Sequence, residues 1–414
     1  MIKTDILIVG AGPAGAATAL KLSYMGIPCV LVDKAVFPRD KVCGDAVSGK
    51  VTTLLNRLDP EILKRFNGDQ NLGIDVWGIK FVAPNHKALN VPFHTQYSKD
   101  RYAAPGYVSK RIDFDNFLVE EVKRRDNIDY HDGTAIDNYE KTERGYIASD
   151  KDKNFQVDTR LLIIADGAHS SFSKNIAGLK KDTGHHAAGI RAYYKNVKGL
   201  HEDNFVELHY VREIQPGYFW IFPLPNGYAN VGLGMRSDYI SKHRVKLKAV
   251  LDDLLKTHPL FKERFENATL ESKVVGFPLP LGSKKRLRSG DNFMLIGDAG
   301  HLVDPFSGEG IGNGIYSGFI AAELAEKCIE QNNFSAKFMY AYDVRLARVL
   351  GKEMQLSYSL QRLFRYPWLS NKVANFVVNN SRLINLISQM YTDLNLRKQL
   401  LNPVFLLKLI FKKN

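Results

Sequence analysis

Cysteine is scarce in this chain, with three residues at positions 29, 43 and 328 of 414. Their spacing forms no disulfide framework, no metal-ligand set and no cluster that could hold an iron–sulfur centre. We therefore expect a protein of a reducing compartment without a metal site. Cys29 and Cys328 stand in apolar runs and are predicted to lie in the core.

Long hydrophobic runs are missing as well. No window reaches the roughly 18 uninterrupted apolar residues of a transmembrane helix. The first residues, Met1-Ile-Lys-Thr-Asp5, lead straight into an apolar strand and leave no room for a signal peptide, so we expect a cytoplasmic protein. The 414 residues contain no repeat or low-complexity linker but exceed a single ordinary core, which predicts two or three structural units.

Acidic residues are few at the end of the chain. Residues 331–414 hold thirteen Lys and Arg against three acids, so this segment carries ten of the thirteen net positive charges. It also contains apolar stretches at 376–378, 383–387 and 404–411. Basic amphipathic helices of this kind bind anionic membrane surfaces, although the solvated face of a helical cap is the alternative. No recognition motif accompanies the charge, which argues against a nucleic-acid partner.

The clearest feature that is present is a glycine fingerprint near the N-terminus. An apolar strand ends in Gly10-Ala-Gly12-Pro13-Ala14-Gly15, a helical pattern follows, and a second apolar run ends at Asp33-Lys34. The glycines allow a tight turn, the approach of a pyrophosphate to the backbone, and close packing of helix on strand. The helix N-terminus favours phosphate, and the acid is placed to bind ribose hydroxyls.

Two further glycine-bearing motifs follow apolar strands. The first is Asp166-Gly167, after the run 161–165, and the second begins at Gly297-Asp298 and ends at Gly310-Ile311, before a helix predicted over 315–330. Each places glycine or aspartate at the carboxyl end of a strand, where ligands bind in open parallel sheets. All three stretches therefore favour one shared nucleotide site.

With these three motifs the sequence resembles the flavoprotein hydroxylase-like superfamily, which implies that the cofactor is FAD. The resemblance places Asp166 and Gly167 near the pyrophosphate, Asp298 at the ribitol chain, and Gly310 and Ile311 beside the isoalloxazine. The dipole of the helix that follows can stabilise the anionic reduced ring.

The same resemblance implies a role near the FAD phosphates for Arg111, with Asp113 capping the helix that follows. An exposed Arg before a helix is the alternative. The superfamily carries an Arg a few residues after the Asp-Gly motif, and here Lys174 stands nearest that place. Because Lys cannot make a bidentate fork, this contact differs from the family pattern.

A second unit is interleaved with the first. Strand-like runs at 76–82, 188–194 and 205–211 and a helical pattern from Leu247 to Leu255 indicate a sheet that roofs the flavin. The predicted fold class is α/β, with a Rossmann-type FAD-binding domain, an interleaved antiparallel-sheet substrate domain and a C-terminal helical region. The expected boundaries are 1–75, 104–181 and 286–330 for the FAD-binding domain, 76–103 and 182–285 for the substrate domain, and 331–414 for the basic helical region.

Two more motifs resemble the geranylgeranyl reductase family over roughly residues 1–330. They are Pro38-Arg-Asp-Lys41-Val-Cys43-Gly44, whose glycine we expect at the flavin, and Tyr218-Phe-Trp220-Ile-Phe222-Pro. Alternate residues of a strand share a face, so Tyr218, Trp220 and Phe222 are predicted to line a tunnel for an isoprenoid chain, or else to form core. Cys43 is the candidate catalytic residue: it can touch the reacting alkene or supply the proton, which water or a neighbouring group can also supply, and Lys41 is expected to lower its pKa. A small buried thiol is the alternative.

The resemblance implies an FAD-dependent reductase of isolated carbon–carbon double bonds in a prenyl lipid. Geranylgeranyl diphosphate, geranylgeranylated lipids and the menaquinone side chain are the family's candidate substrates. The chain shows no second dinucleotide fingerprint, so the electron donor, NAD(P)H or a reduced carrier, stays open. The alternatives are an FAD-dependent monooxygenase or halogenase and a flavin electron carrier to membrane quinone. The basic C-terminal region predicts peripheral association with the inner face of the membrane.

Overall fold

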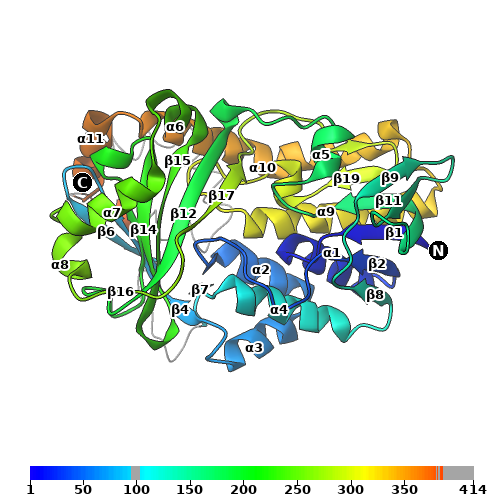
Figure 1. Ribbon diagram of the computed structural model, residues 1–414, viewed down its shortest axis with the longest axis horizontal. Helices are drawn as coiled ribbons and strands as arrows, with labels where there is room; N and C mark the ends of the chain where they lie inside the picture. The colour runs from blue at the N-terminus through cyan, green and yellow to red at the C-terminus, as the bar shows by residue number, and fades with distance from the viewer. Residues whose placement is uncertain (95–102, 379, 381–382, 386–414) are drawn as a thin grey trace.

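The computed structural model describes residues 1–94, 103–378, 380 and 383–385 of the chain. Two large sheets lie in opposite halves of the molecule, and the long helix α10 (Ala336–Leu363) passes along one side from one half toward the other (Figure 1). The functional question is therefore what the junction between the two sheets contains.

The first sheet has eight strands among the described residues, in the order β18-β19-β11-β1-β2-β8, with β10 and β9 added beside β11. The pairs among β19, β11, β1, β2 and β8 are parallel. Its strands are β1 (Ile2–Val9), β2 (Cys29–Val32), β8 (Ile128–His131), β9 (Asn138–Lys141), β10 (Tyr146–Ser149), β11 (Gln156–Ile164), β18 (Ser289–Gly290) and β19 (Phe293–Leu295). This is the Rossmann-type sheet that the fingerprint predicts.

Both faces of this sheet are buried, as in parallel sheets generally. Ile6 and Ile8 of β1 belong to one apolar cluster, and the alternate residues Leu7 and Val9 belong to another on the opposite face. The predicted core cysteines are confirmed, since Cys29 and Cys328 are both buried. Burial raises the pKa of each of these two thiols to about 12.

Helices α1 (Pro13–Tyr24) and α9 (Ile311–Glu330) pack together on one face of the sheet. Their backbones approach so closely that a Cβ on Gly318 would lie 2.0 Å from Thr18 Oγ1. The same half contains α2 (Gly49–Leu58), α3 (Pro60–Gly68), α4 (Arg111–Lys123), α5 (Ser171–Asn175) and the short 3-10 turn η4 (Gly297–Gly300). Both glycine-rich helix starts, on α1 and α9, thus lie close to each other.

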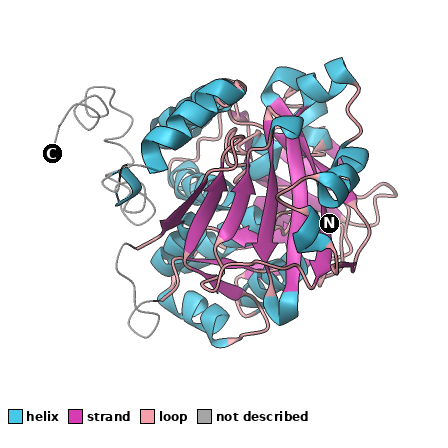
Figure 2. Ribbon diagram, turned by 90° about the vertical axis from the view of Figure 1, so that its left-hand side faces the viewer, coloured by secondary structure: helices cyan, strands magenta, loops and turns pink. Residues whose placement is uncertain are grey.

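The second sheet also has eight strands among the described residues, in the order β16-β12-β15-β14-β13-β5-β6 with β17 beside β12, and it is antiparallel except for β5 against β13. Its strands are β5 (Gly78–Val82), β6 (Ala88–Pro92), β12 (His186–Lys195), β13 (Val206–His209), β14 (Gly217–Pro223), β15 (Tyr228–Arg236), β16 (Thr269–Leu270) and β17 (Val275–Pro280). Figure 2 shows strands of the molecule surrounded by helices.

One face of the second sheet packs against helices, through a cluster that joins Phe219 and Ile221 to Leu251 and Leu254. The helices and 3-10 turns of this half are α6 (Ser237–His243), α7 (Leu247–Thr257), α8 (Lys262–Phe265), η1 (Thr183–His185), η2 (Arg212–Ile214) and η3 (Pro225–Gly227). The other face is turned toward the first half of the molecule.

The predicted strand 76–82 is wrong as a single element. Trp77 separates β4 (Ile74–Val76), which belongs to a small sheet with β3 (Ala46–Val47) and β7 (Gly106–Val108), from β5 in the second large sheet. The Trp77 side chain is almost fully buried in the main core. The chain passes from the small sheet to the second large sheet at this buried residue. Apolar alternation in the sequence does not reveal such a break between two strands.

The C-terminal region begins with α10 and continues with α11 (Pro367–Val378). Met339, Leu346, Leu350 and Met354 form the buried stripe of α10, at helical spacing. Of the apolar stretches in the predicted basic tail, 376–378 ends α11, whereas 404–411 and the end of 383–387 lie outside the described residues. No helix among the described residues combines the length and the apolar content that a membrane span requires.

Candidate active site

A cavity of about 1840 Å³ lies between the two halves. Its walls come from the glycine-rich ends of α1 and α9, the loop 41–50, the inner face of the second sheet, and α10. A single small-molecule site usually occupies about 300–1,000 Å³. The cavity therefore has room for a large cofactor and for a second molecule.

The N-terminus of α1 forms one end of this cavity. No side chain caps the helix at Gly12 and no acid stands in its first turn, so its amides present positive charge. A Cβ on Gly12 would meet only Arg39 Nη2, at 3.5 Å, which is ordinary contact. The fold itself does not require glycine at position 12, and its backbone is open to the approach of a ligand.

The other two fingerprint glycines are needed by the fold. Gly10 has a φ of +104°, and a Cβ there would lie 2.5 Å from the carbonyl oxygen of Ala165. A Cβ on Gly15 would lie 1.8 Å from the Gly10 oxygen. Gly12, Pro13 and Ala14 line the cavity, whereas Gly10 and Gly15 shape the turn behind them.

Asp33 stands at the end of β2, where it is buried. Its Oδ2 accepts a hydrogen bond from the Ala11 amide at 2.7 Å, and its Oδ1 accepts one from the Ala35 amide at 2.8 Å. The carboxylate thus ties the fingerprint loop to the second strand and keeps free lone pairs on both oxygens. Lys34 is exposed and does not line the cavity.

The Asp-Gly motif contributes an acceptor without a partner. Oδ1 of Asp166 is buried and has no hydrogen bond within the described chain. Burial raises the pKa of Asp166 to about 6, against the opposing effect of a hydrogen bond from Ser170. Gly167 lines the cavity with a φ of +84°, and a Cβ there would meet no atom within 4 Å. This free acceptor, the open backbone at Gly12 and the amides of α1 fit a dinucleotide such as FAD.

Arg111 is buried rather than exposed at the start of α4. Its Nε and Nη2 donate to the two carboxylate oxygens of Asp115 at 2.6 Å each, and Arg39 donates to the same carboxylate at 2.6 Å. The predicted cap at Asp113 is wrong, because the helix begins at Arg111 and Asp113 lies inside its first turn. Sequence reasoning missed Arg39, which lies beside Gly12 and brings a second guanidinium to this end.

The cations around Cys43 differ from the prediction. Lys41 Nζ lies 3.3 Å from Asp298 Oδ2, and the cation that interacts with the Cys43 sulfur is Arg111. Burial alone would lower the pKa of Arg111, but Asp115 and Cys43 outweigh it and the net shift is upward. Lys174 is exposed on α5 and does not line the cavity. Asp298 does line it, with Lys41 as its ion-pair partner.

The loop that carries Cys43 and Gly44 is held by a buried polar network. Asn230 Nδ2 donates to the Cys43 carbonyl at 2.8 Å and to Asp45 Oδ2 at 2.7 Å, and Trp220 Nε1 donates to Asn230 Oδ1 at 2.8 Å. Tyr193 also donates to Asp45, at 2.8 Å. Sequence reasoning missed Asn230 and Asp45, because their role depends on hydrogen bonds across the fold.

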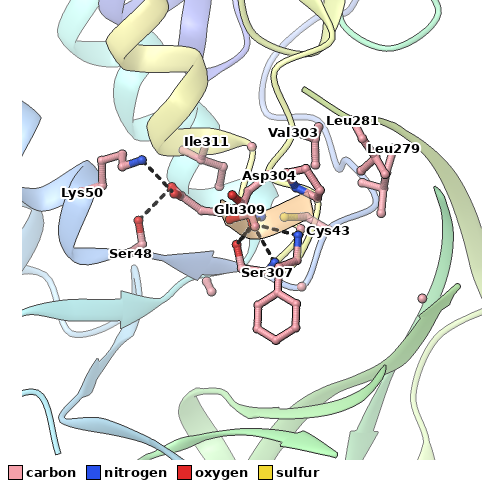
Figure 3. A pocket seen from close by; sticks show the side chains of 18 of the residues that line it. Cys43, Ser48, Lys50, Leu279, Leu281, Val303, Asp304, Ser307, Glu309 and Ile311 are labelled. Carbon is pink, nitrogen blue, oxygen red and sulfur yellow. Dashed lines mark hydrogen bonds and ion pairs between the residues drawn. The ribbon is translucent and has the colours of Figure 1, made fainter. Parts of the chain in front are cut away.

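The start of α9 forms the roof of the cavity (Figure 3). Gly310 and Ile311 line the cavity there. Glu309 Oε1 accepts hydrogen bonds from the Gly312 amide and the Ser48 hydroxyl, both at 2.9 Å. The helix N-terminus thus already holds one carboxylate. Sequence reasoning missed this residue, although a Glu between two glycines at a helix start was visible.

The second sheet supplies an aromatic wall. Tyr218, Trp220 and Phe222 line the cavity, while the alternate residues Phe219 and Ile221 pack into the opposite core. Phe222 also packs against the loop, since a Cβ on Gly44 would lie 3.0 Å from its ring.

The wall continues beyond β14. The Tyr210 ring stacks on Phe306 at 5.7 Å between centroids, and both contact Phe364 at the end of α10. This branch of the cavity is therefore lined by apolar and aromatic side chains from β13, β14, the loop before α9 and the end of α10.

The two-sheet fold and the dinucleotide cradle define a flavoprotein. Residues 3–331 match the family described as FAD binding domain. The chain is 32% identical to the digeranylgeranylglycerophospholipid reductase of Methanococcus vannielii over 82% of this chain and 81% of that protein. It is 24% identical to the menaquinone reductase of Mycobacterium tuberculosis, over 94% of this chain and 91% of that one.

The fold agrees with these relatives. A crystal structure from Thermoplasma acidophilum, described as geranylgeranyl bacteriochlorophyll reductase-like, superposes with a TM-score of 0.80 at 22% identity and covers 97% of this chain and 99% of its own. The chain belongs to the geranylgeranyl reductase family of FAD-dependent oxidoreductases. FAD is its cofactor, and the predicted α/β fold class is confirmed.

Proposed function

We propose that the protein saturates isolated carbon–carbon double bonds in a polyprenyl lipid or in the side chain of an isoprenoid quinone. The observation that carries this proposal is the apolar, aromatic branch of the cavity, which continues from Cys43 and the flavin end along the inner face of β14. An isoprenoid chain has no charged or hydrogen-bonding group along its length, so apolar walls must hold it. The names of the relatives, reductases of a geranylgeranyl phospholipid and of menaquinone, support the same substrate class.

We assign FAD to the glycine-rich end of the cavity. The proposed cradle comprises Gly12, Pro13, Ala14, Gly44, Arg111, Gly167, Asp298, Gly310 and Ile311, which line the cavity, with Gly10, Gly15, Asp33 and Asp166 in the strand ends and turns behind them, whereas the exposed Lys34 lies outside it. It is supported by the open backbone at Gly12 and by the unpartnered Asp166 oxygen. Segments 1–75, 104–181 and 286–330 then form the FAD-binding domain. The strands of the first large sheet, which all fall within those segments, support this division.

Saturation adds a hydride to one alkene carbon and a proton to the other, and reduced FAD supplies the hydride. The chain must supply the proton and the position of the alkene. Cys43 lines the cavity, is half-buried and sits on a loop fixed by Asn230, so its thiol is the candidate proton donor. Arg111 also lines the cavity, and its positive charge can stabilise the thiolate that remains after transfer.

The position of the alkene in the cavity is expected to contribute much of the rate of its reduction. An unactivated alkene offers little charge for the protein to stabilise, and rate therefore comes from orientation in a water-excluding cavity. Tyr218 is held for this purpose by a 2.6 Å hydrogen bond from its hydroxyl to the Ser307 carbonyl. The aromatic wall thus has fixed geometry on the side that the substrate meets.

The test separates this reductase from its alternatives by their use of oxygen. Dithionite-reduced protein, mixed without air with geranylgeranyl lipids or menaquinone, is expected to reoxidise its flavin and to yield products heavier by two hydrogens per saturated bond. Mass spectrometry reads the product. Oxygen- or halide-bearing products formed only in air would replace the proposal with a monooxygenase or halogenase. Flavin reoxidised by quinone with every double bond intact would indicate an electron carrier.

We also propose that the C-terminal region holds the protein at an anionic membrane. Tyr366, Trp368 and Phe376 are exposed large side chains at the end of α10 and on α11, with Lys372 stacked over the Trp368 ring. Aromatic and basic residues together favour the membrane interface. Trp368→Ala with Phe376→Ala should reduce sedimentation with anionic vesicles, and binding should fall as salt rises. Tyr340→Ala, an exposed residue near the other end of α10, is the control; equal losses would contradict the assignment.

A further inference from the structure

The N-terminus of α9 carries a carboxylate of the protein itself. Glu309 stands directly before Gly310 at the start of the helix, and its Oε1 accepts hydrogen bonds from the Gly312 amide and the Ser48 hydroxyl, both at 2.9 Å. A Cβ on Gly312 would lie 2.3 Å from this oxygen. Because the backbone at position 312 is helical, glycine is needed there to admit the carboxylate and not to allow an unusual turn.

This carboxylate reverses the charge that a helix N-terminus normally presents. The α9 helix is 20 residues long, and its aligned peptide dipoles place about half a positive charge at the N-terminus. Its first turn contains no acid, and Glu309 adds a full negative charge directly in front of it. Since a full charge exceeds that half charge, the start of α9 is negative toward the cavity.

Lys50 compensates this negative charge only in part. Its Nζ lies 3.8 Å from Glu309 Oε2, but it lies 3.1 Å from Glu353 Oε1 on α10 and donates to Asn313 Oδ1 at 2.8 Å. Figure 3 shows Lys50 and Ser48 directed toward the Glu309 carboxylate. Two carboxylates thus share one ammonium group, and these three side chains together carry one net negative charge.

The exposed charges of the same wall act more weakly. Arg57, Arg348 and Lys352 line the cavity, but all three are exposed, so water and salt screen them. The Glu309 side chain, in contrast, is 23% exposed and is fixed by its two hydrogen bonds. A fixed, partly buried charge acts more strongly over a given distance than an exposed one, because the effective dielectric constant around it is lower.

We propose that Glu309 lowers the reduction potential of FAD and thereby makes reduced FAD a stronger hydride donor. This inference rests on the proposed function and on its assignment of Gly310 and Ile311 to the flavin. The isoalloxazine is neutral when oxidised and gains negative charge when reduced, so a nearby carboxylate raises the free energy of the reduced form alone. An isolated alkene is a poor hydride acceptor, and a more strongly reducing flavin suits it. Glu309 thus opposes the stabilisation of reduced flavin that the α9 dipole alone would give.

The experiment measures the midpoint potential of the bound flavin in Glu309→Gln and in wild-type protein. Gln keeps the acceptor oxygen for Gly312 and Ser48 and removes only the charge. Both holoproteins are titrated without air against a reference dye, and absorbance reports the flavin. We expect the equilibrium constant for two-electron reduction to rise about tenfold to a hundredfold, which is an upward shift of about 30–60 mV. The dissociation constant for oxidised FAD should stay within about twofold of wild type, because the oxidised ring carries no charge for Glu309 to repel.

Lys50→Gln tests the same charges in the opposite direction. This change removes the cation beside Glu309, so the midpoint potential should fall below the wild-type value. Glu309→Asp keeps the charge on a shorter side chain, and its potential should lie closer to wild type than to Glu309→Gln. Glu330→Gln is the matched control, since Glu330 is an exposed residue at the other end of α9, outside the cavity. Its potential should equal that of wild type.

Several results would overturn the inference. An unchanged or lower potential in Glu309→Gln would do so, and an equal shift in Glu330→Gln would assign the effect to net charge. If Glu309→Asp matched Glu309→Gln, hydrogen-bond geometry and not charge would set the potential. If Glu309→Gln bound too little flavin to titrate, the direction in Lys50→Gln would decide, because a potential at or above wild type would overturn the inference.

The redox titration contains no prenyl lipid, so its result does not depend on the proposed function. If wild-type protein saturates no prenyl lipid, the proposed function fails, whereas an upward shift in Glu309→Gln still supports the role of Glu309. With a lipid that wild-type protein saturates, reduced Glu309→Gln should be reoxidised more slowly in a single turnover without air. Reoxidation at the wild-type rate, despite a raised potential, would overturn the stated link between Glu309 and the strength of the hydride donor.

Discussion

The two ends of the cavity are lined by different kinds of chemical groups. At the flavin end, the end that we assign to FAD, the important groups are backbone atoms, with helix amides at Gly12 and an open turn at Gly167, supported by buried carboxylates. At the substrate end they are side chains, the rings of Tyr218, Trp220 and Phe222 and the α10 face. The flavin end must match one invariant cofactor, whereas the substrate end can change its specificity by changing side chains on an unaltered sheet.

The consequence is a difference in what a mutation can do. A side chain added at the flavin end blocks backbone that a phosphate must approach, so it should abolish binding of the cofactor outright. A side chain removed at the substrate end enlarges the cavity and should change which chains are accepted. The comparison would fail if a side chain added at the flavin end changed only the substrate preference, or if one removed at the substrate end abolished binding of the cofactor.

The largest effect is expected for Gly12→Val. The purified wild-type protein should be yellow and the variant colourless, because the valine side chain would stand where the pyrophosphate approaches the backbone. Among the described residues that are not its chain neighbours, Arg39 Nη2 is the one that a Cβ here would contact, so the fold should tolerate the change. Flavin absorbance per protein, with circular dichroism to check folding, measures the outcome.

Gly68→Ala serves as the control for the first prediction. A Cβ at Gly68 would meet no atom of the described residues within 4 Å, and the residue ends α3 outside the cavity. This variant should keep its full flavin content. If Gly12→Val also binds FAD at full occupancy, the assignment of α1 to the pyrophosphate is wrong.

The next effect concerns the chemistry between the two ends. Cys43→Ser should bind FAD and accept electrons normally, yet reduce alkenes about 10²-fold to 10⁴-fold more slowly, the usual contribution of a positioned proton donor. The hydroxyl is a far weaker acid than the thiol. Single-turnover flavin reoxidation by substrate is the measurement, and Cys29→Ser tests whether the loss is specific to position 43. A wild-type rate in Cys43→Ser would reduce Cys43 to a packing role.

Adjacent residues of β14 allow the sharpest test of the substrate end. Trp220→Ala should lower kcat/KM for long prenyl chains more than for short ones, because Trp220 faces the cavity. Phe219→Ala, on the opposite face, should cost about 3–5 kcal/mol of unfolding free energy and leave the chain-length preference unchanged. The ratio of kcat/KM for twenty-carbon and ten-carbon substrates measures the preference. The same ratio in both variants would show that Trp220 does not form part of the aromatic wall.

The same contrast explains what the sequence could predict. The fingerprint, the Asp-Gly and Gly-Asp motifs and the helix before Glu330 are contiguous segments, so period and glycine spacing predict them. Arg39, Glu309 and Asn230 were missed because their importance comes from contacts across the fold, such as the hydrogen bond from Asn230 to Cys43, 187 positions away. The ion pair between Lys41 and Asp298 was missed for the same reason, since the two residues lie far apart in the sequence.

The smallest expected effect tests the network that joins the two ends. Asp45 is fully buried, and its Oδ1 has no hydrogen-bond partner in the part of the chain that the structure describes. Burial raises its pKa to about 6, while hydrogen bonds from Asn230 and Tyr193 oppose that shift. A carboxyl whose pKa is raised on folding stabilises the protein when protonated, and this contribution is lost as pH rises from about 4 through 6.

Asp45→Asn mimics the protonated form and should lose no stability over that range. The midpoints of urea unfolding, measured from pH 4 to 8, should therefore shift in favour of Asp45→Asn as pH increases. A difference between variant and wild type that does not change with pH would show that Asp45 is ionised throughout, held by Asn230 and Tyr193 as a fixed anion beneath the Cys43 loop.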